Sequence, residues 1–248
     1  MSVRCLVVRG DSTERETPNA YERVVDALAG RADVESDHID ATDVASEIDA
    51  GEAVFAVGAA AVEALAAVET DCPIVPVDVG IGRYDVDAGD VDRVVDALLE
   101  DAFTTVSHPV LAVAVDGERV GHAVADVTLM TSAPARISEY GIETSDGWTE
   151  TVRSDGVVVA TPLGSTGYAR AAGGPTLAPE TGLAAVPISP YAMNPDVWVL
   201  RAPVTLSVKR DEADVSLHLD DDIARSVPAN APVDVTLDRT LSLVSVQK

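Results

Sequence analysis

The sequence predicts an α/β half followed by an all-β half. In the first hundred residues, short apolar runs alternate with segments of helical spacing. From residue 110 onward, almost every apolar run has the length and β-branched composition of a strand, and glycine and proline separate the runs. Alternating strands and helices are typical of a parallel sheet, whereas consecutive short strands indicate all-β structure. We therefore predict a domain boundary near residue 102, with domains 1–102 and 103–248.

Each element of the first half follows from its apolar pattern. Short apolar runs predict strands at 3–8, 54–57 and 73–77, and a more polar segment at 33–40 is predicted as a further strand. Tyr21, Val24, Val25 and Leu28 recur at helical spacing before Gly30, which ends the pattern. Two further helices are predicted at 59–68, which is rich in alanine, and at 91–99, where valine and leucine share one face. Gly58 stands directly between a predicted strand and a predicted helix.

The second half begins with a predicted hairpin. The run 110–115 is followed by Asp116-Gly117 and by a returning run at 119–129, and an Asp-Gly pair between apolar runs is typical of a tight hairpin turn. Further strands are predicted at 157–160, 197–200, 204–208, 215–219, 233–237 and 241–246.

The charge of the chain limits its partners. There are 42 acidic and 17 basic residues, for a formal net charge of -25. Such a charge repels itself in dilute salt, but at molar salt the Debye length falls to about 3 Å and the repulsion is screened. Because the acidic residues are spread over the whole chain, we expect a halophilic protein. Nucleic acid and anionic membranes are disfavoured as partners.

Cysteine and histidine show no pattern of a metal site. Cys5 and Cys72 lie in or beside apolar runs without a CxxC spacing, so we expect buried free thiols and no bound metal. The histidines show no ligand spacing and are expected to be structural or surface residues: His38, His108, His122 and His218. We find no signal-peptide pattern and no apolar stretch of about 18 residues, and therefore expect a soluble, cytoplasmic protein.

The segment with the clearest chemistry is 155–175, DGVVVATPLGSTGYARAAGGP. Small residues allow backbone amides to approach a ligand closely. Ser165 and Thr166 add hydroxyl groups, and Tyr168 offers a ring face or a phenol. These features predict a polar ligand loop, although a tight connection between strands would also need the glycines.

This segment resembles the signature of the NAD kinase family, which reads approximately TPTGSTAYxxSxGGP. Asp155-Gly156 matches the pair that the family has before the preceding strand, and the proline-rich segment 187–195 also fits. Asp220, Asp221 and Asp222 match an Asp-Gly-Gln corner weakly. The resemblance covers residues from about 90 to 225 well, and the N-terminal part only in outline.

The resemblance implies a Rossmann-like N-terminal α/β domain and a C-terminal β-sandwich domain, and it allows the last strand to return to the first domain. NAD or NADP would lie in the crevice between the domains, and the chain would form a homodimer or homotetramer. By position, the residues around the dinucleotide would be Asp126, Asp155, Gly156, Thr166, Gly167 and Tyr168, with Ser165 as a neighbour.

The sequence departs from the family in its phosphate-binding loop. The family's Gly-Gly-Asp-Gly-Thr corresponds to 57–62, VGAAAV, in which only Gly58 remains and Ala60 takes the place of the catalytic Asp. A methyl group accepts no proton, and loss of a general base typically costs about 10²–10⁴-fold in rate. Phosphoryl transfer also depends on positioning and charge stabilisation, so loss of the loop adds to this cost. No acidic residue lies between Ala53 and Val62.

Two further positions depart from the family. Its Asn-Glu pair becomes Ala125-Asp126, which keeps an acid but loses the amide. Its Gly-x-Asn-x-Gly segment becomes 76–80, in which Asp78 brings a carboxylate to the phosphate end. Asp78 is therefore a candidate to replace the missing catalytic group, the alternative being an ordinary solvated acid at a strand end.

Three hypotheses follow from the sequence. The first is an NAD(P)(H)-binding protein with weak or no phosphotransferase activity, acting as a sensor or as the partner of an active NAD kinase paralogue. The second is an active kinase that uses Asp78 or Asp126 with magnesium and ATP or polyphosphate. The third is a scaffold of the same fold with another ligand. Walker-type and Gly-x-Ser-x-Gly motifs are absent from the sequence, which disfavours those enzyme classes.

Overall fold

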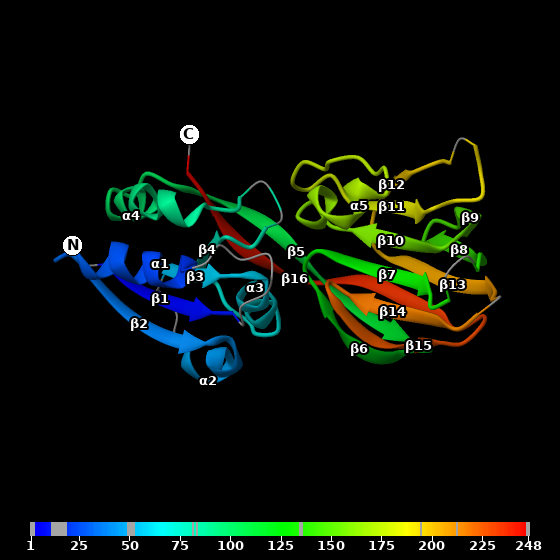
Figure 1. The fold of residues 1–248 in the computed structure, drawn as a ribbon, viewed down its shortest axis with the longest axis horizontal. Coiled ribbons are helices and arrows are strands. Elements are labelled where there is room, and N and C mark those ends of the chain that lie inside the picture. Colours follow the sequence, from blue (N-terminus) through cyan, green and yellow to red (C-terminus); the bar gives the residue numbers. More distant parts are fainter. Residues whose placement is uncertain are drawn as a thin grey trace. The chain divides into compact units, whose positions relative to one another are not determined.

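The computed structural model describes residues 3–10, 19–48, 53–80, 82, 84–133, 136–193, 195–211 and 213–246. The chain forms two compact units (Figure 1). Unit 1 comprises Met1–His108 and Thr240–Lys248, and unit 2 comprises Pro109–Arg239. The strands β5 (Thr104–Val115) and β16 (Pro232–Ser245) contribute residues to both units. The domain boundary near residue 102, which we infer from the sequence, remains a prediction.

Unit 1 is built on a parallel sheet. Its strand order is β2-β1-β3-β4-β16, from β1 (Val3–Arg9), β2 (Val34–Asp40), β3 (Ala53–Val57), β4 (Pro73–Val77) and the end of β16. All five residues of β3 are buried. A parallel sheet is covered on both faces, which explains why its central strands are continuous apolar runs.

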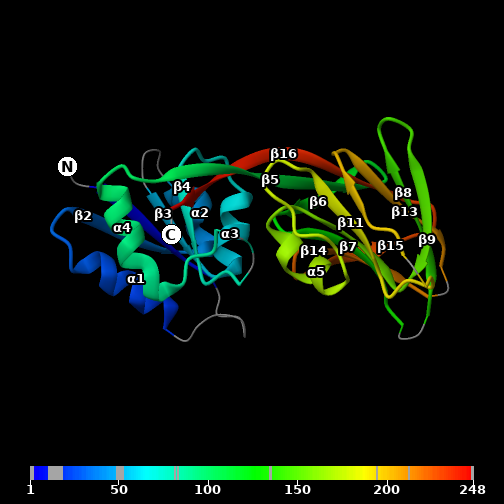
Figure 2. The ribbon, with the colours of Figure 1, turned by 90° about the horizontal axis from the view of Figure 1, so that it is seen from above.

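The helices of unit 1 are α1 (Ala20–Ala29), α2 (Val44–Glu47), α3 (Ala59–Ala66) and α4 (Val91–Leu99), with short 3-10 turns η1 (Ala41–Asp43) and η2 (Ala88–Asp90). α1 and α4 lie side by side (Figure 2) and pack against one face of the sheet, in a cluster that includes Val24, Val94 and Phe55. α3 contacts α2 and buries Val62 and Leu65. Apolar residues at helical spacing form α1, α3 and α4, as the sequence predicts, whereas α2 was not predicted.

The carboxyl ends of the central strands meet where the strand order reverses. From β1 the chain proceeds to β2 on one side, whereas β3 pairs with β1 on the other side. Gly10 N–H donates to Val57 O (2.9 Å), and Gly58 N–H donates to Val77 O (3.0 Å). Such a switch point is the usual position of ligands in open α/β sheets. Gly58 also begins α3 with φ 83° and ψ 164°, a conformation that favours glycine.

Unit 2 is a sandwich of two antiparallel sheets. One has the order β12-β11-β10-β7-β14-β15, and the other combines β9-β8-β13-β16 with β5 and β6. The strands introduced here are β6 (Glu118–Ala123), β7 (Asp126–Thr131), β8 (Ser138–Thr144), β9 (Thr149–Ser154), β10 (Gly156–Ala160), β11 (Leu183–Ile188), β12 (Trp198–Leu200), β13 (Val204–Arg210), β14 (Val215–Leu219) and β15 (Asp222–Val227).

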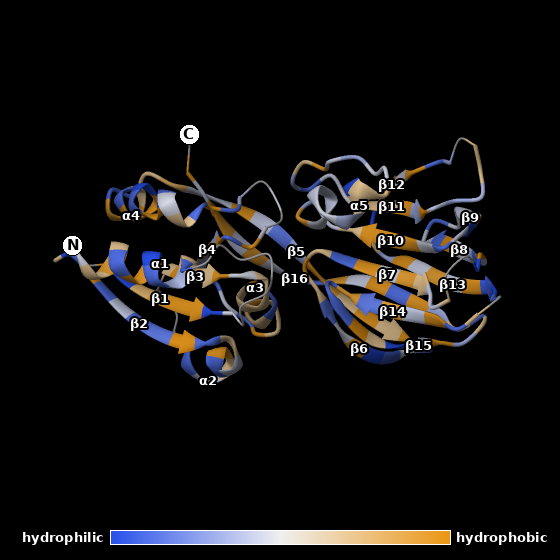
Figure 3. Ribbon diagram, viewed as in Figure 1, coloured by the Kyte–Doolittle hydropathy of each residue, from blue (hydrophilic) through white to orange (hydrophobic). Residues whose placement is uncertain are grey.

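The core of unit 2 lies between these sheets. Leu111, Leu129, Val157 and Leu206 belong to one buried cluster that both sheets supply, and β10 is largely orange in the hydropathy colouring of Figure 3. Tyr140 is fully buried, and its hydroxyl lies 2.7 Å from Thr131 Oγ1 and donates to Asp155 O (3.2 Å). A buried tyrosine needs such partners for its hydroxyl, and this contact also anchors the backbone at the start of β10.

The strands differ from the prediction in several places. The returning run at 119–129 is two strands, β6 and β7, with a turn at residues 124–125 between them. The runs at 233–237 and 241–246 are one continuous strand, β16. β8, β9, β11 and β15 were not predicted. β15 is exposed over all but one residue, so its sequence shows no apolar alternation.

Among the described residues, none of the helices is both long and apolar enough to span a membrane.

Replacement of Gly58 by alanine tests the strain at the start of α3. Because φ and ψ of Gly58 are 83° and 164°, we expect Gly58→Ala to lower the free energy of unfolding by about 1–3 kcal/mol. Gly30→Ala is the matched control, since Gly30 has φ -75° and the nearest atom to an added Cβ is 3.7 Å away. Urea unfolding followed by circular dichroism measures both, and equal effects of the two substitutions would contradict the assignment of strain to Gly58.

Candidate functional site

The loop that follows β10 is held against the turn between β6 and β7. Thr161 Oγ1 donates a hydrogen bond to Val124 O (2.7 Å) and accepts one from Gly164 N–H (3.3 Å). At Gly164 an added Cβ would lie 2.1 Å from Ala125 O. A larger residue therefore cannot occupy this position without moving one of the two segments, which explains the first glycine of GSTGY.

The two hydroxyl groups of the loop bond to its own backbone. Ser165 is fully buried; its Oγ donates to Pro162 O (2.7 Å) and accepts from Leu177 N–H (2.9 Å). Thr166 Oγ1 donates to Leu163 O (3.0 Å). These bonds shape the 3-10 turn η3 (Gly164–Thr166), which precedes the short helix α5 (Tyr168–Ala171). Ser165 was expected to neighbour a ligand, but its hydroxyl braces the loop from inside.

Tyr168 stands at the exposed side of this braced loop. Its side chain is 43% exposed although it is a large aromatic residue. Partial burial raises the pKa of Tyr168, and the nearby carboxylates of Asp126 and Asp155 raise it further. Tyr168 is therefore within electrostatic range of both carboxylates. Among the described residues, the Tyr168 hydroxyl and the Asp155 carboxylate have no hydrogen-bond partner, so both remain available to a ligand.

Asp126 lies at the start of β7, opposite Ala160 of β10. It is 7% exposed, and its Oδ1 accepts a hydrogen bond from Thr128 Oγ1 (3.0 Å). Gly156, in contrast, is buried within β10, where an added Cβ would lie 2.5 Å from Leu129 O. Asp126 thus lies beside the end of β10 and Asp155 just before its start, whereas Gly156 allows close packing of β10 against β7.

Asp220 organises the turn beneath the loop. Its carboxylate accepts hydrogen bonds from the backbone N–H groups of Val124 (2.9 Å), Ala125 (2.7 Å) and Asp126 (2.9 Å). Successive amides that converge on one anion form a stable concavity. Burial raises the pKa of Asp220, and the three N–H donors oppose this shift. The sequence showed only a weak motif match at this corner and did not reveal its role.

The segment that resembles the family's phosphate-binding loop in outline lies in unit 1. Gly58 begins α3, which has no side-chain cap, and Ala59, Ala60 and Ala61 form its first turn. An added Cβ on Gly10 would lie 3.1 Å from Ala61 N and 3.4 Å from Ala60 Cβ. The Ala60 methyl thus lies close to Gly10, directly after β1.

Asp78 follows β4 directly and has a left-handed backbone conformation, with φ 49°. Its Oδ1 accepts a hydrogen bond from Ala88 N–H (3.3 Å), whereas Oδ2 is buried without a partner. Nearby, Asp85 accepts bonds from Val79 N–H and Gly80 N–H, and burial raises the pKa of Asp85. A buried carboxylate oxygen without a hydrogen bond is unfavourable, which marks Asp78 as unusual among the acids of this chain.

No group of three or more His, Cys, Asp or Glu side chains is arranged to hold a metal ion within the described part of the chain.

The histidines do not form a common site. His108 is buried, His38 lies edge-on to the Tyr21 ring, and His218 Nε2 contacts Ser216 Oγ (2.9 Å). His122 belongs to β6 and Asp126 to β7, so the two do not share a strand as the sequence suggested. His122 instead contacts charged residues of β16, which sequence reasoning did not anticipate.

The C-terminal half of the chain matches a known family. Residues 124–240 match the model of the ATP-NAD kinase C-terminal domain. This range contains the braced loop, Asp126, Asp155, Tyr168 and Asp220. The C-terminal part of the chain is therefore similar to the C-terminal domain of NAD kinases.

Curated relatives carry the name NAD kinase. The chain is 29% identical over 201 residues to that of Methanosarcina mazei, covering 79% of this chain and 69% of the relative. It is 29% identical over 178 residues to that of Methanopyrus kandleri, covering 71% and 61%. It is 32% identical over 141 residues to that of Methanosphaera stadtmanae, covering 55% and 50%. The chain thus matches between half and about two thirds of the length of these relatives.

Solved structures confirm the fold. Yeast NADH kinase complexed with NADH superposes with a TM-score of 0.75 at 14% identity, covering 100% of this chain and 84% of that one. An NAD kinase from Archaeoglobus fulgidus in complex with ATP superposes with a TM-score of 0.64 at 18% identity, covering 99% and 94%. The chain therefore has an NAD kinase-like fold, with a mixed α/β N-terminal part and a C-terminal β-sandwich.

Replacement of Asp220 by asparagine tests whether the Asp220 carboxylate stabilises the turn between β6 and β7. One oxygen of the carboxylate accepts two amides and the other accepts one, so the NH₂ group of asparagine would face a backbone donor. An unsatisfied buried donor costs about 1–3 kcal/mol, and we expect Asp220→Asn to lower the free energy of unfolding by that amount. Urea unfolding followed by tryptophan fluorescence measures it, because Trp148 and Trp198 both lie in unit 2.

The matched control is Asp221→Asn at the exposed neighbouring position, which we expect to change stability by less than about 0.5 kcal/mol. If Asp220→Asn is as stable as this control, Asp220 does not support the turn.

Proposed function

We propose that this protein binds NAD, NADP or a reduced form through Asp126, Asp155, Thr166, Gly167 and Tyr168, and that it has weak or no phosphotransferase activity. The observation that carries the proposal is the partly exposed Tyr168 ring within electrostatic range of two carboxylates, on a loop in which the Ser165 and Thr166 hydroxyls donate to the loop's own backbone. A braced loop presents its one exposed ring at low entropic cost, which favours binding.

The residues fit the chemistry of a dinucleotide. A carboxylate accepts hydrogen bonds from ribose hydroxyls, as acidic residues do in other dinucleotide sites, and an exposed aromatic ring offers a stacking surface for a base or a nicotinamide. The unpartnered Asp155 carboxylate and Tyr168 hydroxyl supply an acceptor and a donor for such a ligand. The complex of yeast NADH kinase with NADH, which has the same fold, supports this class of ligand.

The residues at the expected site of the phosphoryl donor favour the proposal that phosphoryl transfer is weak or absent. Ala60 stands where the family has its catalytic acid, and the first turn of α3 contains only alanines. This chain therefore has no group at that position to take the proton from a ribose 2'-hydroxyl. Removal of a general base typically costs about 10²–10⁴-fold in rate. We accordingly propose that the protein acts as a dinucleotide sensor or as the partner of an active NAD kinase paralogue.

The second candidate function is an active NAD kinase in which Asp78 replaces the missing acid. The buried, unpartnered Oδ2 of Asp78 and its left-handed backbone favour it, because such strain often marks functional positions. ATP is the donor that the related Archaeoglobus fulgidus structure supports; polyphosphate is the alternative, with magnesium as the metal.

Two further properties belong to the proposal. We infer a homodimer or homotetramer from the resemblance. We also infer adaptation to high salt from the net charge of -25, since molar salt screens the repulsion between acidic residues. Binding and activity are therefore best measured in molar potassium chloride.

Calorimetric titration of NAD and NADP tests the binding proposal. Loss of ring stacking typically costs about 1–3 kcal/mol per base, so we expect Tyr168→Ala to weaken dinucleotide binding roughly tenfold or more. Tyr168→Phe keeps the ring and should bind within a few-fold of the wild type, whereas Asp155→Asn should weaken binding. Asp116→Asn, in the exposed turn between β5 and β6, is the control. Absence of dinucleotide binding by the wild type would end the proposal.

Formation of NADP by the purified protein decides between the two candidates. With NAD, magnesium and either ATP or polyphosphate, the first proposal predicts little or no turnover. If turnover occurs, the second candidate predicts that Asp78→Ala lowers it by about 10²–10⁴-fold. Asp71→Ala, at an exposed position before β4, is the control: it also removes a carboxylate, and we expect it to leave turnover unchanged. Turnover that Asp78→Ala leaves unchanged removes Asp78 from the mechanism.

A further inference from the structure

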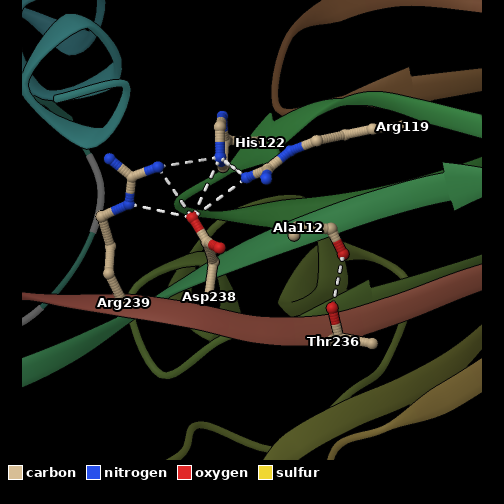
Figure 4. Close-up of polar contacts among 6 residues, drawn as sticks. All are labelled: Ala112, Arg119, His122, Thr236, Asp238 and Arg239. Carbon is tan, nitrogen blue, oxygen red and sulfur yellow. Dashed lines mark hydrogen bonds and ion pairs between the residues drawn. The ribbon is translucent and has the colours of Figure 1, made fainter.

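On strands β6 and β16 of unit 2, three side chains converge on one carboxylate oxygen of a fourth, Asp238 (Figure 4). We refer to the four residues as the Arg–His cluster: Arg119, His122, Asp238 and Arg239. Asp238 Oδ2 lies 3.0 Å from Arg119 NH2, 3.1 Å from His122 Nε2 and 2.7 Å from Arg239 NH2. His122 Nε2 also lies 3.0 Å from Arg239 NH2 and contacts Arg119 NH2.

A β-bulge creates this arrangement. In a regular strand, residues three apart point to opposite faces of the sheet. Between β5 and β6, however, Val113 pairs with Gly121 and Ala114 pairs with Arg119, so one residue of β6 has no partner. Such a bulge reverses the alternation and places Arg119 on the same face as His122. Across the sheet, Ala112 stands opposite His122 and adds no charge.

The cluster carries excess positive charge. Hydrogen bonding to Arg239 holds the pKa of Asp238 below its usual value, so its carboxylate is ionised. Burial lowers the pKa of His122, and the two arginines lower it further, which keeps the imidazole neutral at neutral pH. Two guanidinium groups therefore face one carboxylate. The chain has 42 acidic residues, yet only Asp238 enters this network among the residues that the structure describes.

Both arginines retain free donors. A guanidinium has five N–H bonds. Arg239 uses Nε and NH2 toward Asp238 and His122, whereas Arg119 uses only NH2. NH1 of either residue makes no hydrogen bond within the described chain. Because 54% of the Arg119 side chain and 22% of the Arg239 side chain are exposed, these donors are accessible to solvent.

We propose that the Arg–His cluster binds a linear phosphate chain, as found in inorganic tripolyphosphate or in the triphosphate of a nucleotide. Guanidinium forks match the oxygens of phosphate groups, and Asp238 fixes the orientation of both forks before a ligand arrives. Both guanidinium groups lie within hydrogen-bond distance of one oxygen of Asp238, so an anion at their free donors is attracted by both. A chain of several phosphates carries more negative charge than chloride or a single carboxylate and is therefore attracted more strongly. The proposal does not rest on dinucleotide binding, because the cluster shares no residue with the Tyr168 loop.

Titration of the full chain with tripolyphosphate, ATP and adenosine, without metal, tests the proposal. We expect tripolyphosphate and ATP to bind, and Arg119→Ala to weaken the binding of both. Adenosine has no phosphate, so any binding of adenosine to the Tyr168 surface should be the same in the wild type and in Arg119→Ala. Equal affinities of the first two would show that the phosphate chain alone is recognised, and tighter binding of ATP would show that the nucleoside adds contacts; either result supports the site. If neither tripolyphosphate nor ATP binds to the folded wild type, the proposal is wrong.

Variants separate a binding site from a purely structural ion-pair network. Arg119→Ala and Arg239→Ala should each weaken tripolyphosphate binding roughly tenfold or more. Arg225→Ala, which removes a comparable surface arginine paired with Glu118 on the same unit, should leave it unchanged. Asp238→Asn should strengthen binding several-fold, because it removes the competing negative charge while keeping the side-chain shape.

Circular dichroism confirms that each variant is folded before its affinity is compared. Tripolyphosphate affinities of Arg119→Ala and Arg239→Ala that equal the wild-type value would overturn the proposal, as would a folded Asp238→Asn variant that binds no more tightly. Tyr168→Ala should bind tripolyphosphate as the wild type does, so failure of the dinucleotide proposal remains distinguishable from failure of this one.

Discussion

The candidate binding surface depends on one interaction, the capture of three backbone amides by the Asp220 carboxylate. These amides belong to residues 124–126, and the same turn supplies the carbonyl oxygens to which Thr161 donates. The turn is therefore held by β14 on one side and by the loop after β10 on the other. Because Ser165 and Thr166 bond inward, Tyr168 is presented on a fixed support. The few exposed groups of this support determine what it can bind.

Charge divides unit 2 into regions with different chemistry. Around Tyr168 the carboxylates of Asp126 and Asp155 would repel phosphate groups but accept hydrogen bonds from hydroxyls, so this region suits the ribose and ring of a dinucleotide. The Arg–His cluster has the opposite balance, with two guanidinium groups around Asp238. In a chain with a net charge of -25, such a local positive region is the place where an anion gains most.

The sequence predicted the helices and strands that have a clear local pattern of apolar residues. It missed the features that depend on contacts with residues distant in the sequence. β3, α4 and β10 follow from uninterrupted or periodic apolar residues, and the GSTGY loop from its composition. The sequence of a glycine-rich loop does not reveal whether a hydroxyl group points into the loop or outward. Ser165 was therefore expected near a ligand. The Arg–His cluster could not be predicted, because a bulge in β6 and a strand more than a hundred residues later create it. The unpartnered oxygen of Asp78 likewise appears only in the folded structure.

The most direct test is a crystal structure of the protein with NAD, from crystals grown in molar potassium chloride. It tests the claim that the dinucleotide binds at the Tyr168 surface. We predict that a ring of the dinucleotide stacks on Tyr168 at a separation of about 4 Å, and that a ribose hydroxyl donates a hydrogen bond to Asp126 or Asp155. The turn at residues 124–126 should keep its three bonds to Asp220. NAD bound elsewhere, with Tyr168 still exposed to solvent, would contradict the assignment of this surface.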